Sequence, residues 1–180
     1  DRQNYDGRTA LMLAAESGKT AIVRFLVDSG ADVCVRDEGY GEMALMKAVF
    51  QGHSEIVRLL LNAGSHIGTN AWDDDLDDLL AAAALRGCCS IVRMLLEGGA
   101  DMDAIHENSG TTALMWAAAG GHADVVKLLV DAGADKDVRD PAGMTAFAYA
   151  QRWGFDELGG LLCPESFHLA SDTGAKRRRL

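Results

Sequence analysis

Proline and long apolar runs are the two features that this sequence most clearly lacks. The 180-residue chain contains two prolines, and its glycines are scattered rather than arranged in a collagen-like period. This composition excludes a fibrous or disordered chain. No apolar run approaches the roughly 18 residues that span a bilayer, and no basic-then-apolar signal peptide opens the chain. These absences predict a folded protein that does not associate with a membrane.

Cysteine is also scarce. Cys34, Cys88, Cys89 and Cys163 include one adjacent pair and no Cys-x-x-Cys motif. A small secreted scaffold held by disulfides would contain many more cysteines. We therefore expect reduced thiols and a cytoplasmic protein, with the nucleus as the alternative location.

Positive charge is in short supply as well. The formal net charge is −10 at pH 7. The C-terminal tail, residues 164–180, has four basic and two acidic residues and therefore a charge of +2, which leaves −12 for residues 1–163. Because an acidic surface repels phosphate backbones, the charge predicts no direct binding to nucleic acid.

What the sequence does contain is a repeat. The segment TALMLAAESGKTAIVRFLVDSGAD at residues 9–32 returns, with changes, at residues 43–66, 78–101 and 112–135, and a shortened copy starts at residue 145. A glycine recurs every 33 to 35 residues, at Gly18, Gly52, Gly87, Gly121 and Gly154. A fixed period of this length indicates a repeat architecture.

Each unit has the pattern of two short helices. We expect the first helix to follow an N-cap residue at Thr9, Asp78, Thr112 and Thr145, whereas Met43 occupies the same position and cannot cap. The recurring glycine ends this helix, and a strongly apolar second helix runs to a Gly-Ala-Asp stop. Because so short a pair cannot bury its apolar faces alone, the copies are predicted to stack into a solenoid.

The repeat resembles the ankyrin repeat, whose signature is Thr-Pro-Leu-His-x-Ala followed by Gly-His and Gly-Ala-Asp. The resemblance covers residues 4–163, and the Gly-His pair recurs at residues 52–53 and 121–122. It implies an all-α solenoid of stacked helix-turn-helix units with short β-hairpin fingers. The ankyrin-repeat domain is then residues 1–163, with repeats at 4–35, 36–69, 70–104, 105–138 and 139–163, and the tail follows at 164–180.

The resemblance also assigns roles to single residues. Met12, Met46 and Met115 stand where the family has a histidine that hydrogen-bonds within the repeat, so we expect packing to replace that bond. His53 and His122 are expected to tie neighbouring loops together. The first repeat has an apolar second helix and the chain begins without a methionine, so we expect a fragment with further repeats upstream.

No catalytic or metal-binding constellation emerges from the motifs. Asp73, Asp75 and Asp77 mimic the first three ligands of an EF-hand loop, but Asp78 and Ala84 stand where that loop needs glycine and glutamate. The cysteines and histidines lack the paired spacing of a zinc site. No phosphate-binding loop or nucleophile elbow is present. We therefore predict no enzymatic activity, no metal and no cofactor.

The resemblance implies that partners bind the fingers and the exposed side of each first helix, on the concave face of the stack. Every tryptophan and tyrosine falls at such a position, and these residues and arginine are enriched in binding hot spots. The alternative is that the rings pack between adjacent fingers and hold the stack together. The predicted partner-binding residues are Tyr5, Arg8, Tyr40, Glu42, Lys47, Phe50, Trp72, Asp74, Asp75, Asp77, Arg86, Trp116, Tyr149, Arg152 and Trp153.

Two charged segments predict further contacts. The aspartates at residues 73–77 would form an acidic finger that attracts a basic segment of a protein partner, with a solvated acidic loop as the alternative. Lys176, Arg177, Arg178 and Arg179 match a nuclear-localisation pattern. We expect a monomer, and the alternative is self-association in which the basic tail docks on the acidic finger.

Taken together, these patterns predict a non-enzymatic protein–protein interaction module that acts as a scaffold or adaptor. Two alternatives stay open. One is a regulatory domain from a larger enzyme, ubiquitin-ligase subunit or channel, and the other is a structural spacer with no specific ligand.

Overall fold

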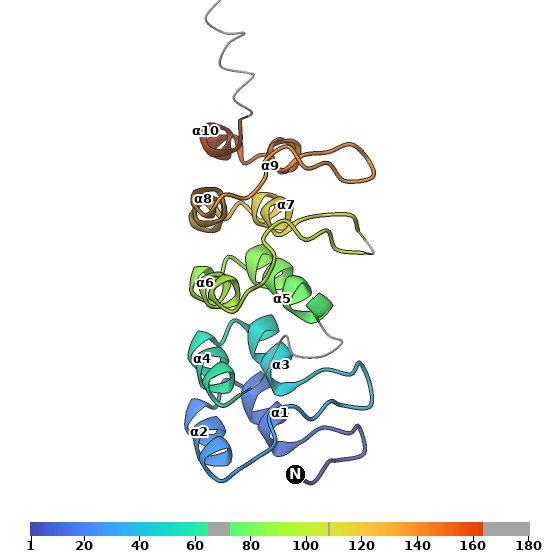
Figure 1. Ribbon diagram of the computed structural model, residues 1–180, viewed down its shortest axis with the longest axis vertical. Coiled ribbons are helices and arrows are strands. Elements are labelled where there is room, and N and C mark those ends of the chain that lie inside the picture. Colours follow the sequence, from blue (N-terminus) through green and yellow to red (C-terminus); the bar gives the residue numbers. More distant parts are fainter. Residues whose placement is uncertain (65–72, 108, 164–180) are drawn as a thin grey trace, which may run out of the picture.

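Paired helices stack along one axis of the molecule (Figure 1). The computed structural model describes residues 1–64, 73–107 and 109–163. The first helices of the five units are α1 (Ala10–Glu16), α3 (Ala44–Gln51), α5 (Asp73–Leu85), α7 (Ala113–Ala119) and α9 (Ala146–Trp153). The second helices are α2 (Thr20–Asp28), α4 (Ser54–Asn62), α6 (Cys89–Glu97) and α8 (Ala123–Ala132), and in the fifth unit a 3-10 turn, η1 (Asp156–Leu158), continues into α10 (Gly159–Leu162).

The loops before the first helices, which were expected to be β-hairpin fingers, are rich in turns. Over the described ranges the structure has no strand, and Gln3 and Thr9 form an isolated antiparallel bridge.

Some of the predicted residues cannot be placed. Trp72 and the basic tail with Lys176–Arg179 lie outside the described residues, so the expectations attached to them stay predictions.

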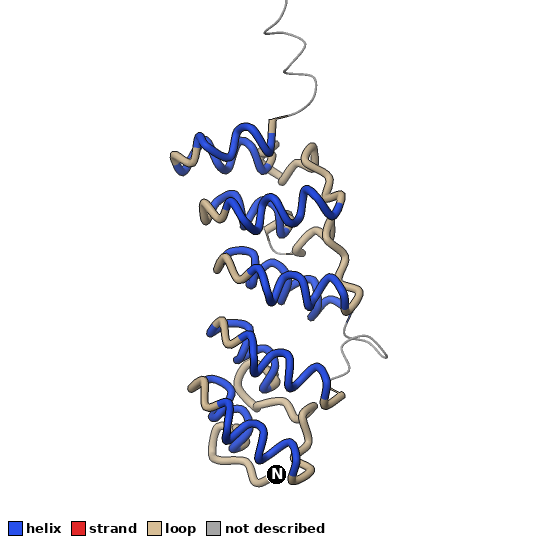
Figure 2. The backbone as a smooth tube through the Cα atoms, turned by 90° about the vertical axis from the view of Figure 1, so that its left-hand side faces the viewer, coloured by secondary structure: helices blue, strands red, loops and turns tan. Residues whose placement is uncertain are grey.

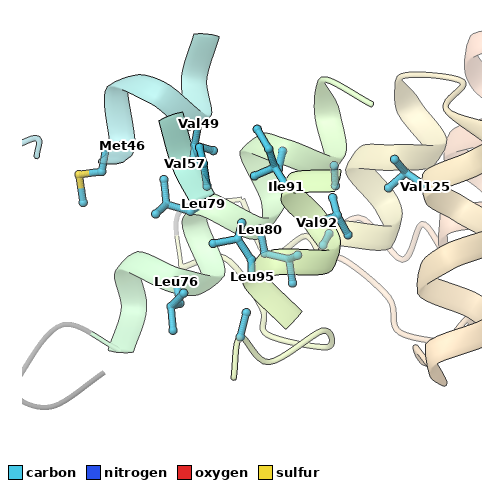
Figure 3. Close-up of a cluster of buried hydrophobic side chains, with 14 of the residues drawn as sticks. Met46, Val49, Val57, Leu76, Leu79, Leu80, Ile91, Val92, Leu95 and Val125 are labelled. Carbon is cyan, nitrogen blue, oxygen red and sulfur yellow. The ribbon is translucent and has the colours of Figure 1, made fainter. Parts of the chain in front are cut away.

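The core lies between the two layers of helices and continues from one unit to the next. The first helices form one layer and the second helices form the other, as two perpendicular views show (Figures 1 and 2). Leu79, Leu80, Ile91 and Leu95 belong to the cluster of buried side chains that α5 and α6 share (Figure 3). Each of these side chains is at most 1% exposed, and burying one contributes about 1.5–3 kcal/mol.

Threonine hydroxyls start three of the first helices, as predicted. The hydroxyl of Thr9 accepts a hydrogen bond from the backbone N–H of Met12 at 3.3 Å, and Thr112 and Thr145 cap α7 and α9 in the same way. The sulfur of Met12 in turn accepts the N–H of Thr9 at 3.3 Å. The expectation that methionine would only pack is therefore incomplete, because the buried thioether also serves as a weak acceptor.

The predicted start of the third unit is wrong. The sequence placed an N-cap at Asp78 and an acidic finger before it, but α5 begins at Asp73 and is 13 residues long. Leu76 explains the difference: it is 7% exposed and starts the apolar series that continues through Leu79 and Leu80 (Figure 3). The aspartates before it fall in the first helical turn, where the helix dipole favours negative charge.

The recurring glycine ends the first helix in a left-handed conformation, and at Gly18 and Gly87 it leaves room for a histidine of the next unit. Gly87 has a φ of +71°, and a Cβ added there would lie 2.5 Å from Nδ1 of His122. Nε2 of the same ring donates to the carbonyl oxygen of Leu85 at 2.8 Å, as His53 does to that of Glu16 at 3.2 Å. The predicted structural role of both histidines is confirmed.

This arrangement makes Gly87→Ala more harmful than the same change in the last unit. Gly154 has a φ of +81° with open space around it. Both variants should lose about 1 kcal/mol of unfolding free energy from the left-handed backbone. Gly87→Ala should lose at least about 1 kcal/mol more, because the His122 ring must move. Urea unfolding measures both losses. In a His122→Ala background the extra loss should vanish, and equal losses in the wild-type background would contradict the contact.

Candidate functional site

A groove runs along α5 on the face of the stack that the first helices form. Its floor follows the i, i+3, i+4, i+7 spacing that places residues on one side of a helix. Its two sides come from α3 and α7, and a histidine from the loop before α7 closes one end. The volume is about 240 Å³. We name this the central groove; it is lined by Phe50, Asp78, Ala81, Ala82, Leu85, His106 and Trp116.

Most of the central groove is apolar and open to solvent. Phe50 is 37% exposed and Leu85 is 43% exposed, while Trp116 is half-buried and packs against the core. The alanines of α5 are too small to fill the space between these larger side chains. The structure therefore brings together Phe50 and Trp116, which the sequence had predicted as separate binding residues.

His106 stands at the finger position that Asp37 and Asp140 hold in other units. Its backbone N–H donates to the carbonyl oxygen of Thr111 at 2.9 Å, which closes the loop. Its Nε2 lies 3.3 Å from Oδ1 of Asp78 across the groove, and its Nδ1 is buried and has no hydrogen-bond partner in the described part of the chain. A buried acceptor without a partner costs about 1–3 kcal/mol. The side chain of His106 therefore contacts Asp78 in the groove, while its Nδ1 does not form a hydrogen bond within its own loop.

A family model described as ankyrin repeats, in three copies, matches residues 1–71 and 79–172. The chain belongs to the ankyrin-repeat family. The all-α ankyrin solenoid predicted from the sequence is confirmed. Ankyrin repeats are in general non-catalytic modules that bind other proteins.

One predicted contact residue of the ankyrin stack is not available to a partner. Lys47 was expected on the exposed side of α3, but it is 3% exposed. Its Nζ lies 2.9 Å from Oδ2 of Asp37 and 2.7 Å from Oε2 of Glu42. Both carboxylates come from the preceding finger, so the lysine holds that finger against the first helix. Glu42, also predicted as a contact, is committed to the same ion pair.

The pKa values of this charged group follow from its hydrogen bonds. Burial alone would raise the pKa of Asp37, but hydrogen bonds from Lys47 and from the backbone N–H groups of Glu42 and Tyr40 lower it below its usual value. Burial would likewise lower the pKa of Lys47, but the hydrogen bonds to Glu42 and Asp37 raise it. Asp37 and Lys47 are therefore both charged at neutral pH.

Tyr149 occupies the equivalent position in the fifth repeat and has the same kind of partner. Its hydroxyl donates to Oδ2 of Asp140 at 2.8 Å. The backbone N–H of Met144 lowers the pKa of Asp140 against the opposing effect of burial. Burial and the hydrogen bond to Asp140 both raise the pKa of Tyr149. The hydrogen bond to Asp140 therefore supports the alternative role for Tyr149, in which the side chain holds the finger in place.

The remaining predicted residues are spread over the stack. Arg8 pairs with Glu16 at 3.0 Å, and Oδ1 of Asp77 accepts the backbone N–H of Asp101 at 3.0 Å. The side chains of Asp74 and Asp75 lie outside the described part of the structure. The side chains of Tyr5, Tyr40, Arg86, Arg152 and Trp153 are exposed to solvent, and Nη1 of Arg152 donates to the sulfur of Met144 at 3.6 Å.

The sequence missed part of the central groove. Ala81 and Ala82 could have been found from their helical spacing once α5 was placed correctly. The contact between Asp78 and His106 had no signal, because the two residues are 28 positions apart and belong to different repeats.

A second, larger groove lies between α6 and α8 on the opposite face. Its volume is about 730 Å³, and it is lined by Cys89, Arg93, Leu96, Glu97, Asp124, Lys127, Leu128, Asp131 and Ala132. Charges of both signs alternate along it, so it favours no single kind of partner. Burial and the nearby carboxylate of Asp124 raise the pKa of the Cys89 thiol, and a raised pKa makes a cysteine a poor nucleophile.

Two kinds of feature are absent from the part of the chain that the structure describes. No helix there is long and apolar enough to cross a membrane. No three histidine, cysteine, aspartate or glutamate side chains in that part converge on a metal site.

The buried charge group predicts a large effect of Lys47→Met on stability. The substitution leaves Asp37 and Glu42 without their counter-ion, so we expect a loss of about 3 kcal/mol or more in the free energy of unfolding at pH 7. Arg8→Met removes an ion pair whose side chains are about a third exposed, and it should cost less than about 1 kcal/mol. Urea unfolding of both variants tests the difference, and similar losses would contradict the buried role of Lys47.

The loss should also depend on pH. The lowered pKa of Asp37 means that its contribution is present above the unfolded value of about 3.9 and disappears as pH falls through the folded value. The raised pKa of Lys47 means that its contribution is present below about 10.4 and disappears as pH rises through the folded value. The difference between wild type and Lys47→Met should thus be constant from about pH 5 to 9 and shrink on either side.

Proposed function

We propose that this ankyrin domain, residues 1–163, is a scaffold or adaptor that binds a protein partner through the central groove on its concave face. The observation that carries the proposal is the clustering of Phe50, Leu85 and Trp116, all partly exposed, around one groove. Aromatic anchors in a pocket ringed by other contacts are typical of binding hot spots.

The rigidity of the groove supports the same function. Its floor is a 13-residue helix, and its sides come from helices that pack on that floor through buried alanines such as Ala83, Ala84 and Ala117. Because the surface exists before the partner arrives, little conformational entropy is lost on binding. A groove of about 240 Å³ is also smaller than the 300–1,000 Å³ typical of small-molecule pockets, which favours a protruding side chain of another protein.

We further propose that the domain acts as a monomer in the cytoplasm or nucleus. The four cysteines, all free thiols in the structure, support a reducing compartment.

The function is tested by comparing proteins that bind the wild type and two variants. Phe50→Ser/Trp116→Ala removes both sides of the central groove. Phe25→Ser is the matched control, because Phe25 is 69% exposed on α2, away from the groove. Affinity capture with quantitative mass spectrometry should find proteins lost by at least about tenfold from the groove variant and retained by the control. If the wild type, the groove variant and the control bind identical sets of proteins, the result contradicts the proposed binding role of the groove.

A further inference from the structure

The central groove has an apolar floor and one exposed acidic end. The side chain of Asp78 is 58% exposed, and it lies on the same face of α5 as Ala81, Ala82 and Leu85. Apart from His106, the other residues that line the groove are apolar. A side chain that fits this surface therefore needs an apolar stem and a group that can donate hydrogen bonds to a carboxylate.

Asp78 can accept such a donor. An ionised carboxylate offers about four acceptor positions, and the described contact of Asp78 is the one between its Oδ1 and Nε2 of His106 at 3.3 Å. A partner group that reaches the remaining positions would add a charge-assisted hydrogen bond at an exposed end of the groove.

The surrounding charges favour a cation at this place. Asp77 lies in the same helical turn of α5. The nearest lysine on the neighbouring first helix, Lys47, is already neutralised by two carboxylates. Residues 1–163 carry a formal charge of −12 in total. A positively charged group is therefore attracted towards the groove before it makes contact.

Trp116 favours arginine over lysine as the cation in this groove. Its indole ring lines the groove beside the α5 floor and packs on the core, so its position is fixed. Aromatic rings attract cations at their faces, and arginine stacks on tryptophan more readily than lysine does. Arginine also combines an aliphatic stem with a planar head that can bind a carboxylate through two parallel hydrogen bonds.

We propose that the central groove holds an arginine side chain of an extended partner segment, with its stem over Ala81 and Ala82 and its guanidinium between Asp78 and Trp116. Apolar residues next to this arginine in the partner contact Phe50 and Leu85. The proposal rests on the proposed function, because it names the chemistry that the same groove recognises.

The experiment uses a library of random 12-residue peptides displayed on phage, selected on the 180-residue chain at low salt. The selected peptides should share an arginine with an apolar residue within two positions. A tight binder is then synthesised with arginine and with citrulline, its uncharged analogue, and the affinity of each is measured by fluorescence polarisation. Replacing arginine by citrulline should weaken binding by about fivefold or more.

Two variants locate the effect. Asp78→Asn should weaken binding of the arginine peptide by about the same factor and leave the citrulline peptide almost unchanged. Asp131→Asn is the control, since it removes the same charge from α8 on the opposite face and should change neither affinity. Equal affinities of the arginine and citrulline peptides would overturn the proposal. So would equal losses of affinity for the arginine peptide in Asp78→Asn and Asp131→Asn.

Failure of the inference can be told apart from failure of the proposed function. Peptides whose affinity drops with Trp116→Ala but does not depend on charge would contradict the arginine and leave the groove as the binding site. Peptides that bind equally well to Trp116→Ala would contradict the groove itself. A library that yields no enriched peptide counts against both.

Discussion

Burial between successive helix pairs is the interaction on which everything else in this ankyrin domain depends. Leu45, Leu80 and Leu114, one from each of three neighbouring first helices, are at most 1% exposed. Isolated helices of seven to thirteen residues are at best marginally stable in water, so each pair exists as a helix pair only because its neighbours cover it. Packing against a neighbouring helix pair decides how far an apolar side chain is buried. Ile22 of α2 is 50% exposed, whereas Ile56 at the equivalent position of α4 is 1% exposed.

Small side chains determine both the close packing and the groove. Ala48, Ala83 and Ala117 are fully buried between first helices and allow those helices to lie close together. Ala81 and Ala82 belong to the same helix but line the central groove, where their small size leaves space above the floor. The alanine run of α5 therefore has two roles that differ only by the side of the helix that each alanine occupies.

The repeat frame could be predicted from the sequence because its signals are local. Threonine N-caps, left-handed glycines and the bridging histidines each act within a few residues or at a fixed offset of one repeat, and the structure has them where expected. The start of α5 was mispredicted because the family pattern placed a finger there, while the apolar spacing of Leu76, Leu79 and Leu80 favours a helix. Local periodicity outweighed the average pattern of the family.

The site was harder to predict than the fold, for electrostatic reasons. A lysine in an amphipathic helix is normally exposed, and the burial of Lys47 depends on Asp37 and Glu42, which reach it from the loop before the helix. The pairing of Asp78 with His106 likewise depends on how two repeats sit against each other. The contact between Asp78 and His106 follows from the stacking of two repeats and has no pattern in the sequence.

The central claim is that one rigid face of the stack, the central groove, is the binding surface. Amide hydrogen exchange of the 180-residue chain, measured free and bound to a captured protein partner, tests this claim most directly. The account predicts slower exchange on binding in α3, α7 and the C-terminal half of α5, with no change in α6 and α8. Slower exchange in α6 and α8, with α3, α5 and α7 unchanged, would contradict it and move the binding surface to the opposite face.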